Sequence, residues 1–98
     1  MYIGIDLGGT NIAGALVDKD GAIVKRAGMP TVADGGAKAI TDGLLRVCDI
    51  LAENESAPIS IGIGVPGTVN YETGDVIFTA NLPLSGANIT RELREKYD

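Results

Sequence analysis

Residues 2–17 have the sequence YIGIDLGGTNIAGALV, and this stretch decides the fold. Residues 2–6 and 12–17 are two short apolar runs of strand length, and the residues between them favour a tight reversal of the chain, so a β-hairpin is predicted. A turn of the Asp-Gly type at 18–21 leads into a third apolar run at 22–27. The opening of the chain is therefore predicted to be a three-stranded antiparallel meander.

The apolar pattern changes its period after Gly36. Apolar residues then recur at helical spacing while charged residues fall on the opposite side, which predicts one amphipathic helix with its exit marked by Pro58. Its apolar face comprises Ala37, Ile40, Leu44, Val47, Cys48 and Leu51. Residues 59–65 (ISIGIGV) follow and are apolar enough for a central strand parallel to the first, reached by a right-handed crossover.

The last third of the chain predicts a second hairpin and a short helix. Residues 66 and 67 (Pro-Gly) suit a type II turn, and residues 68–71 and 75–79 are predicted to pair outside the main sheet. Asn88 is a good capping residue for a final helix that runs through Glu95 or beyond. We expect an α/β fold in one domain over residues 1–98, with a mixed sheet of an antiparallel meander plus one parallel strand and flanking helices.

Composition limits the partners of the chain. The net charge of -5 and the lack of a Lys/Arg cluster remove the attraction that nucleic acid or an anionic membrane would require, so neither is expected. No run resembles a signal peptide or a membrane span, which predicts a cytoplasmic protein. The absence of histidine excludes Ser-His-Asp and Cys-His catalysis within this chain. Cys48 is the only cysteine and is expected to be a buried thiol.

The residues between the first two strands have the character of a phosphate-binding loop. Gly8 and Gly9 allow backbone N–H groups to approach an anion closely, and Thr10 adds a hydroxyl donor. Asp6 stands where the first strand ends and could hold Mg²⁺ directly or through water. The alternative is that the glycines merely permit a tight hairpin and that Asp6 merely caps it. The complete string from Asp6 to Asn11 favours the phosphate loop.

Residues 62–67 (GIGVPG) match the spacing G-x-G-x-x-G but do not predict a dinucleotide site. That fingerprint needs a helix to begin within the glycine loop, whereas hairpin-like sequence follows here. The remaining alternatives are close packing of a strand or a strand end that borders a ligand. Asn81 precedes a proline turn, and by itself it is more typical of a loop organiser than of a ligand-binding residue.

Three strings taken together resemble the ROK family of sugar kinases and sugar-responsive regulators. They are residues 3–11 (IGIDLGGTN), 62–67 (GIGVPG) and 81–83 (NLP), in that order. The opening string alone is shared in looser form by Hsp70-like chaperones, relatives of actin and other sugar kinases. The resemblance implies a ribonuclease H-like lobe of the actin-like ATPase superfamily.

The resemblance also implies roles for individual residues. Asp6, Gly8, Gly9, Thr10 and Asn11 would form the loop for the phosphates of ATP, with Mg²⁺ at Asp6. Gly67 and Asn81 would line the sugar pocket, with Asn81 hydrogen-bonded to a ring hydroxyl.

The family's general base is an aspartate in an Asn-Asp pair on the next strand, so no residue of this chain is expected to be catalytic. The second lobe and a His/Cys zinc motif are also expected outside these 98 residues.

The function implied for the longer protein is ATP-dependent phosphorylation of a hexose, with glucose as the first candidate. The chain alone is expected to be inactive, to need the missing C-terminal lobe and to be capable of forming a homo-oligomer. One alternative is a fragment of a sugar-sensing ROK repressor, although its DNA-reading module would precede the phosphate loop and Met1 leads directly into the first strand. Another is the lobe of an actin-like or chaperone-type ATPase without a sugar substrate, which has no evident use for residues 62–67 together with Asn81.

Overall fold

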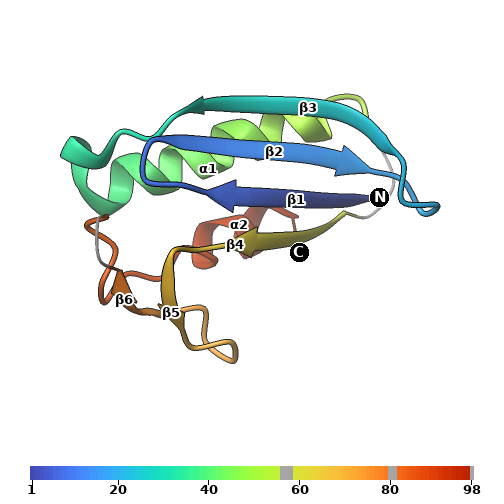
Figure 1. Cartoon of the computed structure of the whole chain (residues 1–98). Coiled ribbons are helices and arrows are strands. Elements are labelled where there is room, and N and C mark those ends of the chain that lie inside the picture. Colours follow the sequence, from blue (N-terminus) through green and yellow to red (C-terminus); the bar gives the residue numbers. More distant parts are fainter. Residues whose placement is uncertain (56–58, 80–81, 98) are drawn as a thin grey trace.

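The computed structural model describes residues 1–55, 59–79 and 82–97 (Figure 1). The elements in chain order are β1 (Tyr2–Leu7), β2 (Asn11–Val17), β3 (Ile23–Pro30), a 3₁₀ turn (Ala33–Gly35), α1 (Gly36–Ala52), β4 (Ser60–Gly64), β5 (Gly67–Val69), β6 (Val76–Thr79) and α2 (Arg91–Tyr97).

The main sheet has the strand order β3-β2-β1-β4. The first three strands are antiparallel to their neighbours in sequence, while β4 runs parallel to β1. β5 and β6 form a separate antiparallel pair that projects away from this sheet (Figure 1). The predicted mixed sheet and the predicted outlying hairpin are both confirmed.

The core lies between the sheet and the two helices. In β1 the side chains of Ile3, Ile5 and Leu7 are buried, while Tyr2 and Asp6 alternate with them on the exposed face. These side chains belong to the same core cluster as the apolar stripe of α1, and each fully buried Leu or Ile contributes about 1.5 to 3 kcal/mol to folding. The core residues are Ile3, Ile5, Leu7, Ile12, Leu16, Ile40, Leu44, Val47, Cys48, Leu51, Val76, Leu82, Leu84, Ile89 and Leu93. Burial raises the pKa of the Cys48 thiol to about 11, so the prediction of a buried thiol is confirmed.

The predicted type II turn at residues 66 and 67 is wrong. That turn requires a positive φ at its third residue. The glycines with positive φ are Gly21, Gly36, Gly74 and Gly86. Gly67 instead begins β5, and its N–H donates to the carbonyl of Val65 at 2.8 Å, which closes a three-residue turn around Pro66.

Several predicted boundaries also move. β3 runs to Pro30 because Met29 and Pro30 pair with Ile12 and Asn11 of β2, which extends the strand beyond the predicted range of 22–27. The final helix begins at Arg91, and the Asn88 side chain accepts the N–H groups of Thr90 at 3.1 Å and Arg91 at 3.0 Å. The Asn88 side chain thus satisfies an N–H group at the start of the helix, as predicted, although Thr90 occupies the N-cap position, because its carbonyl accepts the N–H of Arg94 at 2.9 Å. Pro58, the predicted exit of the first helix, lies outside the described residues, and α1 ends at Ala52.

A polar cluster fastens α2 to α1. The Asp49 carboxylate on α1 accepts hydrogen bonds from the Lys96 ammonium at 2.6 Å and from the Tyr97 hydroxyl. Both donors lie in the last turn of α2. Partial burial acts to raise the pKa of Asp49, but the hydrogen bonds from Lys96 and Tyr97 outweigh it and hold the pKa below its ordinary value. The ionised carboxylate is thus the form that the folded chain prefers.

We expect Asp49→Asn to lower the free energy of unfolding at neutral pH by no more than about 1 kcal/mol, because the carboxylate is partly exposed to solvent. The folded pKa lies below the unfolded value, so this contribution is complete above the unfolded pKa and disappears as the pH falls through the lower folded one. Urea unfolding at pH 7 and near pH 3 measures it. Asp42→Asn, which removes an exposed partner of Lys38 on the same helix, is the matched control. Equal losses for the two variants at pH 7, or a loss for Asp49→Asn that persists at low pH, would contradict the role of the cluster.

Candidate functional site

The candidate phosphate loop joins the inner strands β1 and β2 at one end of the main sheet. The N–H of Gly8 donates to the carbonyl of Asn11 at 2.9 Å and closes the hairpin. A Cβ on Gly8 would lie 2.9 Å from that carbonyl oxygen, so the close approach requires glycine. This part of the hairpin prediction is confirmed.

Gly9 has no comparable structural reason to be glycine. Hairpins with two-residue loops favour glycine because their turns require positive φ, yet neither Gly8 nor Gly9 has one. A Cβ on Gly9 would meet nothing within 4 Å. Neither the backbone conformation nor the internal packing therefore requires glycine at position 9, and the space beside this residue is open to a ligand.

Several hydrogen-bond donors of the loop are unpartnered among the described residues. Gly9 and Thr10 are exposed, and within the part of the chain that the structure describes neither their N–H groups nor the Thr10 hydroxyl has a hydrogen-bond partner. Asn11 is exposed as well, at the first position of β2. An anion placed against the loop could accept several of these bonds.

Asp6 lies beside the loop on the exposed face of β1. Its neighbours across the sheet are Gly64 on β4 and Ala13 on β2, both small. None of the ion pairs among the described residues includes Asp6. The same residues contain no group of three His, Cys, Asp or Glu side chains that could hold a metal ion. A single free carboxylate fits Mg²⁺, which keeps several waters and takes further oxygens from phosphate.

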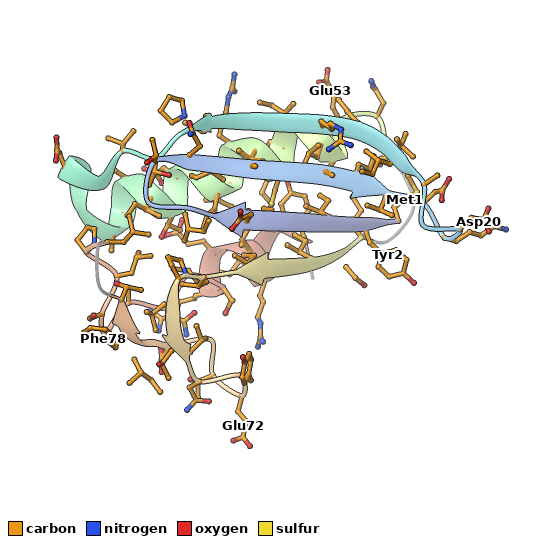
Figure 2. The ribbon with its side chains drawn as sticks, in the orientation of Figure 1. Met1, Tyr2, Asp20, Glu53, Glu72 and Phe78 are labelled. Carbon is orange, nitrogen blue, oxygen red and sulfur yellow. The ribbon has the colours of Figure 1, made fainter. Side chains whose placement is uncertain are left out.

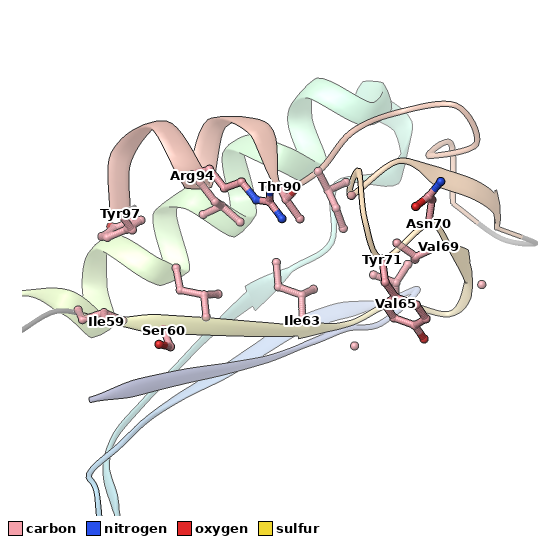
Figure 3. Close-up of a pocket in the computed structure, with 16 residues that line it drawn as sticks. Ile59, Ser60, Ile63, Val65, Val69, Asn70, Tyr71, Thr90, Arg94 and Tyr97 are labelled. Carbon is pink, nitrogen blue, oxygen red and sulfur yellow. The ribbon is translucent and has the colours of Figure 1, made fainter.

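A groove of about 990 Å³ runs along the face of β4 that carries the Ile61 and Ile63 side chains (Figure 3). Its floor is β4, including Ile61 and Ile63, one wall is α2 with Leu93, Arg94 and Tyr97, and the β5–β6 hairpin closes one end. Figure 3 shows Arg94 extending over β4 and Asn70 and Tyr71 on the hairpin side. The lining is thus mostly apolar, with a few amide, hydroxyl and guanidinium groups, as in many small-molecule sites.

Gly67 lines this groove, as expected for a residue of a sugar pocket, and it also has a structural reason to be glycine. A Cβ there would lie 2.0 Å from the carbonyl oxygen of Phe78, which would prevent the pairing of β5 with β6. Figure 2 shows Phe78 on this projecting hairpin and Glu72 at its tip. Asn81, the other predicted sugar ligand, lies outside the described residues.

Gly64 connects the loop region with the groove. It pairs with Asp6 in the parallel β1–β4 ladder and also lines the groove. Gly67 follows Gly64 by three residues, so it and the predicted phosphate-binding residues lie near the end of the main sheet at which β1 and β4 terminate. Parallel strands of α/β proteins commonly present ligand sites at their carboxyl ends.

Thr31 is a residue of this region that the sequence did not indicate. It follows β3 directly, and its hydroxyl donates to the carbonyl of Gly8 at 2.8 Å across 23 residues of sequence. A lone threonine after a proline gives no signal of such a contact. Only the pairing of β2 with β3 brings the two segments together.

The chain is an α/β lobe with a mixed four-stranded sheet, and comparison with known proteins supplies its family. The ROK family model matches residues 2–98, and the chain belongs to this family. The glucokinase of Thermotoga maritima is 36% identical over 83% of the chain and 25% of that protein. The N-acetyl-D-glucosamine kinase of Citrobacter koseri is 33% identical over 100% of the chain and 32% of that protein.

A solved structure shows the same architecture. The ROK family glucokinase from Streptomyces griseus, crystallised with glucose and AMPPNP, matches with a TM-score of 0.84 and 26% identity over 97% of this chain and 30% of that one. The structural neighbours are ROK sugar kinases of the actin-like ATPase fold, which confirms the predicted fold class. The chain spans about a quarter to a third of the length of these relatives. No helix in the described ranges is long and apolar enough to cross a membrane.

The outer edge of β4 is expected to promote self-association, because within the described residues its only strand partner is β1. Such an edge presents unpaired N–H and C=O groups to other chains. The N–H of Ser60 donates to the carbonyl of Met1, so the N–H of Ile61, the next residue along the strand, faces outward. We expect Ile61→Pro, which removes this donor, to weaken association more than Ile61→Ala, which retains it.

Sedimentation analysis and thermal melting over a range of protein concentrations provide the measurement. A concentration-independent monomer with a high melting temperature, or equal association of the two Ile61 variants, would show that β4 does not mediate pairing.

Proposed function

We propose that residues 1–98 form the N-terminal phosphate- and sugar-binding lobe of an ATP-dependent sugar kinase, which transfers the γ-phosphoryl group of ATP to a hydroxyl of a hexose. The observation that carries the proposal is the open loop at Gly9 and Thr10, whose donors lack partners among the described residues. The carboxylate of Asp6 lies beside it, and the groove reaches the same end of the sheet at Gly64 and Gly67. Phosphate, metal and sugar would thus meet at one place.

The residues of the chain suggest how the substrates would be held. The N–H groups of Gly9 and Thr10 and the Thr10 hydroxyl would donate to phosphate oxygens, while Asn11 would border the same loop. Asp6 would hold Mg²⁺ through its carboxylate or an intervening water, and the ion would neutralise charge on the phosphates. Gly67 would line the sugar pocket, and the Asn81 amide would hydrogen-bond a ring hydroxyl.

The chain supplies positioning and charge stabilisation rather than proton transfer. Phosphoryl transfer to a sugar hydroxyl needs a base that accepts the hydroxyl proton. We assign no carboxylate of these 98 residues to that role and place the base in the remainder of the kinase.

Glucose is the hexose that we propose first. The Thermotoga relative is a glucokinase, and the Streptomyces neighbour was crystallised with glucose. N-acetylglucosamine is the second candidate, because the Citrobacter relative is an N-acetyl-D-glucosamine kinase. Sugar-dependent consumption of ATP separates a kinase from a sugar-sensing regulator, and sugar-dependent stabilisation separates it from an ATPase that has no sugar site.

If the phosphate and sugar sites are separate, Thr10→Ala and Asn81→Ala should raise the KM for different substrates in a complete kinase that carries this chain. Thr10→Ala should raise the KM for ATP by the equivalent of about 1.5 to 3 kcal/mol, the loss of one hydrogen bond to a charged group, with little effect on sugar binding. Asn81→Ala should raise the KM for the sugar instead. Thr10→Ser retains the hydroxyl and is the control. If both alanine variants impaired the use of the same substrate, the assignment of two sites would fail.

The isolated chain is expected to show no sugar phosphorylation above background, since it lacks an assigned base. A coupled assay with ATP, Mg²⁺ and a panel of glucose, N-acetylglucosamine, fructose and allose measures turnover directly. Reproducible, sugar-dependent turnover by the pure chain would mean that a carboxylate within it acts as the base.

A further inference from the structure

Thr31 makes two hydrogen bonds to the β1–β2 loop from the end of β3. Its backbone N–H donates to the carbonyl of Thr10 at 2.8 Å, and its side-chain hydroxyl donates to the carbonyl of Gly8, also at 2.8 Å. The hydroxyl bond is partly buried. A single residue just beyond β3 thus engages two of the three carbonyl groups between β1 and β2.

These bonds fix the direction of the loop's N–H groups. A peptide unit is planar and trans, so the C=O of one residue and the N–H of the next point in opposite directions. Holding the Gly8 carbonyl toward Thr31 therefore turns the Gly9 N–H away from Thr31. The bond from the Thr31 N–H to the Thr10 carbonyl likewise turns the Asn11 N–H away from Thr31. Both carbonyls are also withdrawn from a position where they would repel an anion.

We propose that Thr31 is a positioning residue of the phosphate loop, whose hydroxyl holds the Gly8–Gly9 peptide with its N–H directed at the phosphates of ATP. The inference rests on the proposed function, because it requires the loop to bind phosphate. Thr31 itself touches no phosphate; it acts through the peptide that it orients.

The two bonds have different sequence requirements. Any residue except proline offers the backbone N–H that Thr31 donates to Thr10, and this bond continues the pairing of β2 with β3. The hydroxyl bond to Gly8 needs Ser or Thr with this geometry. Thr31→Val therefore removes only the hydroxyl bond at nearly constant shape, whereas Thr31→Ser retains it.

The test uses a complete kinase that carries this chain, in NMR experiments with and without MgATP. Without nucleotide, we expect the backbone order parameter of Gly9 to be near that of rigid backbone, about 0.85, in the original chain and in Thr31→Ser, and to fall toward about 0.6 in Thr31→Val. With MgATP, the amide signals of Gly9, Thr10 and Asn11 should shift, and Thr31→Val should raise the Kd about threefold to tenfold, the effect of one hydrogen bond. Thr41→Val, which removes a hydroxyl bonded to the Ala37 carbonyl at 2.9 Å on α1, is the matched control.

The outcomes separate the inference from the proposed function. If MgATP shifted no loop signal in the original chain, the loop would not be the phosphate site, and the role of Thr31 would fall with it. If the loop bound MgATP but Thr31→Val bound it as tightly as Thr31→Ser, the phosphate loop would stand and the inference about Thr31 would be overturned. An equal loss of affinity in Thr31→Val and Thr41→Val would also overturn it, because the effect would then reflect general stability.

Discussion

The alternation of side chains along β1 is the constraint on which the rest of the structure depends. Ile3, Ile5 and Leu7 point to one face, and burying them in the core that they share with α1 fixes both the register and the orientation of the strand. Asp6 must then point to the opposite face, at the end of the strand that carries the loop. A slip of one residue would place a carboxylate in the core and expose the apolar side chains. The folding energy and the placement of the charged group are therefore set by the same pattern.

The larger elements could be predicted because each rests on a local, periodic signal. Two short apolar runs on either side of turn residues predicted the hairpin, helical spacing predicted α1, and the capping preference of asparagine predicted a helix after Asn88, which begins at Arg91. The prediction of a type II turn was wrong because a Pro-Gly pair is compatible with that turn but does not require it. The pairing of Gly67 with Thr79 draws this glycine into a strand and imposes an extended backbone instead.

The site could be predicted only in part, for a related reason. A local string of residues marks the loop itself, and the resemblance to a family assigns it a ligand. The contact of Thr31 with Gly8 is created by the register between β2 and β3, which no short motif encodes. The groove likewise depends on how α2 lies over β4, a matter of tertiary packing and of the cluster around Asp49. The role of Asn81 stays a prediction, since that residue lies outside the described part of the chain.

The β5–β6 hairpin forms its own two-stranded sheet, whereas the phosphate loop belongs to the main one. Substitutions in the hairpin that reshape one end of the groove do not have to pass through the register that holds β1 and β2. Under the proposed function, a lineage built on this lobe would exchange one sugar for another by remodelling the hairpin without altering the loop at Gly9 and Thr10. The division of the fold into two sheets would then let the choice of sugar and the binding of phosphate evolve separately.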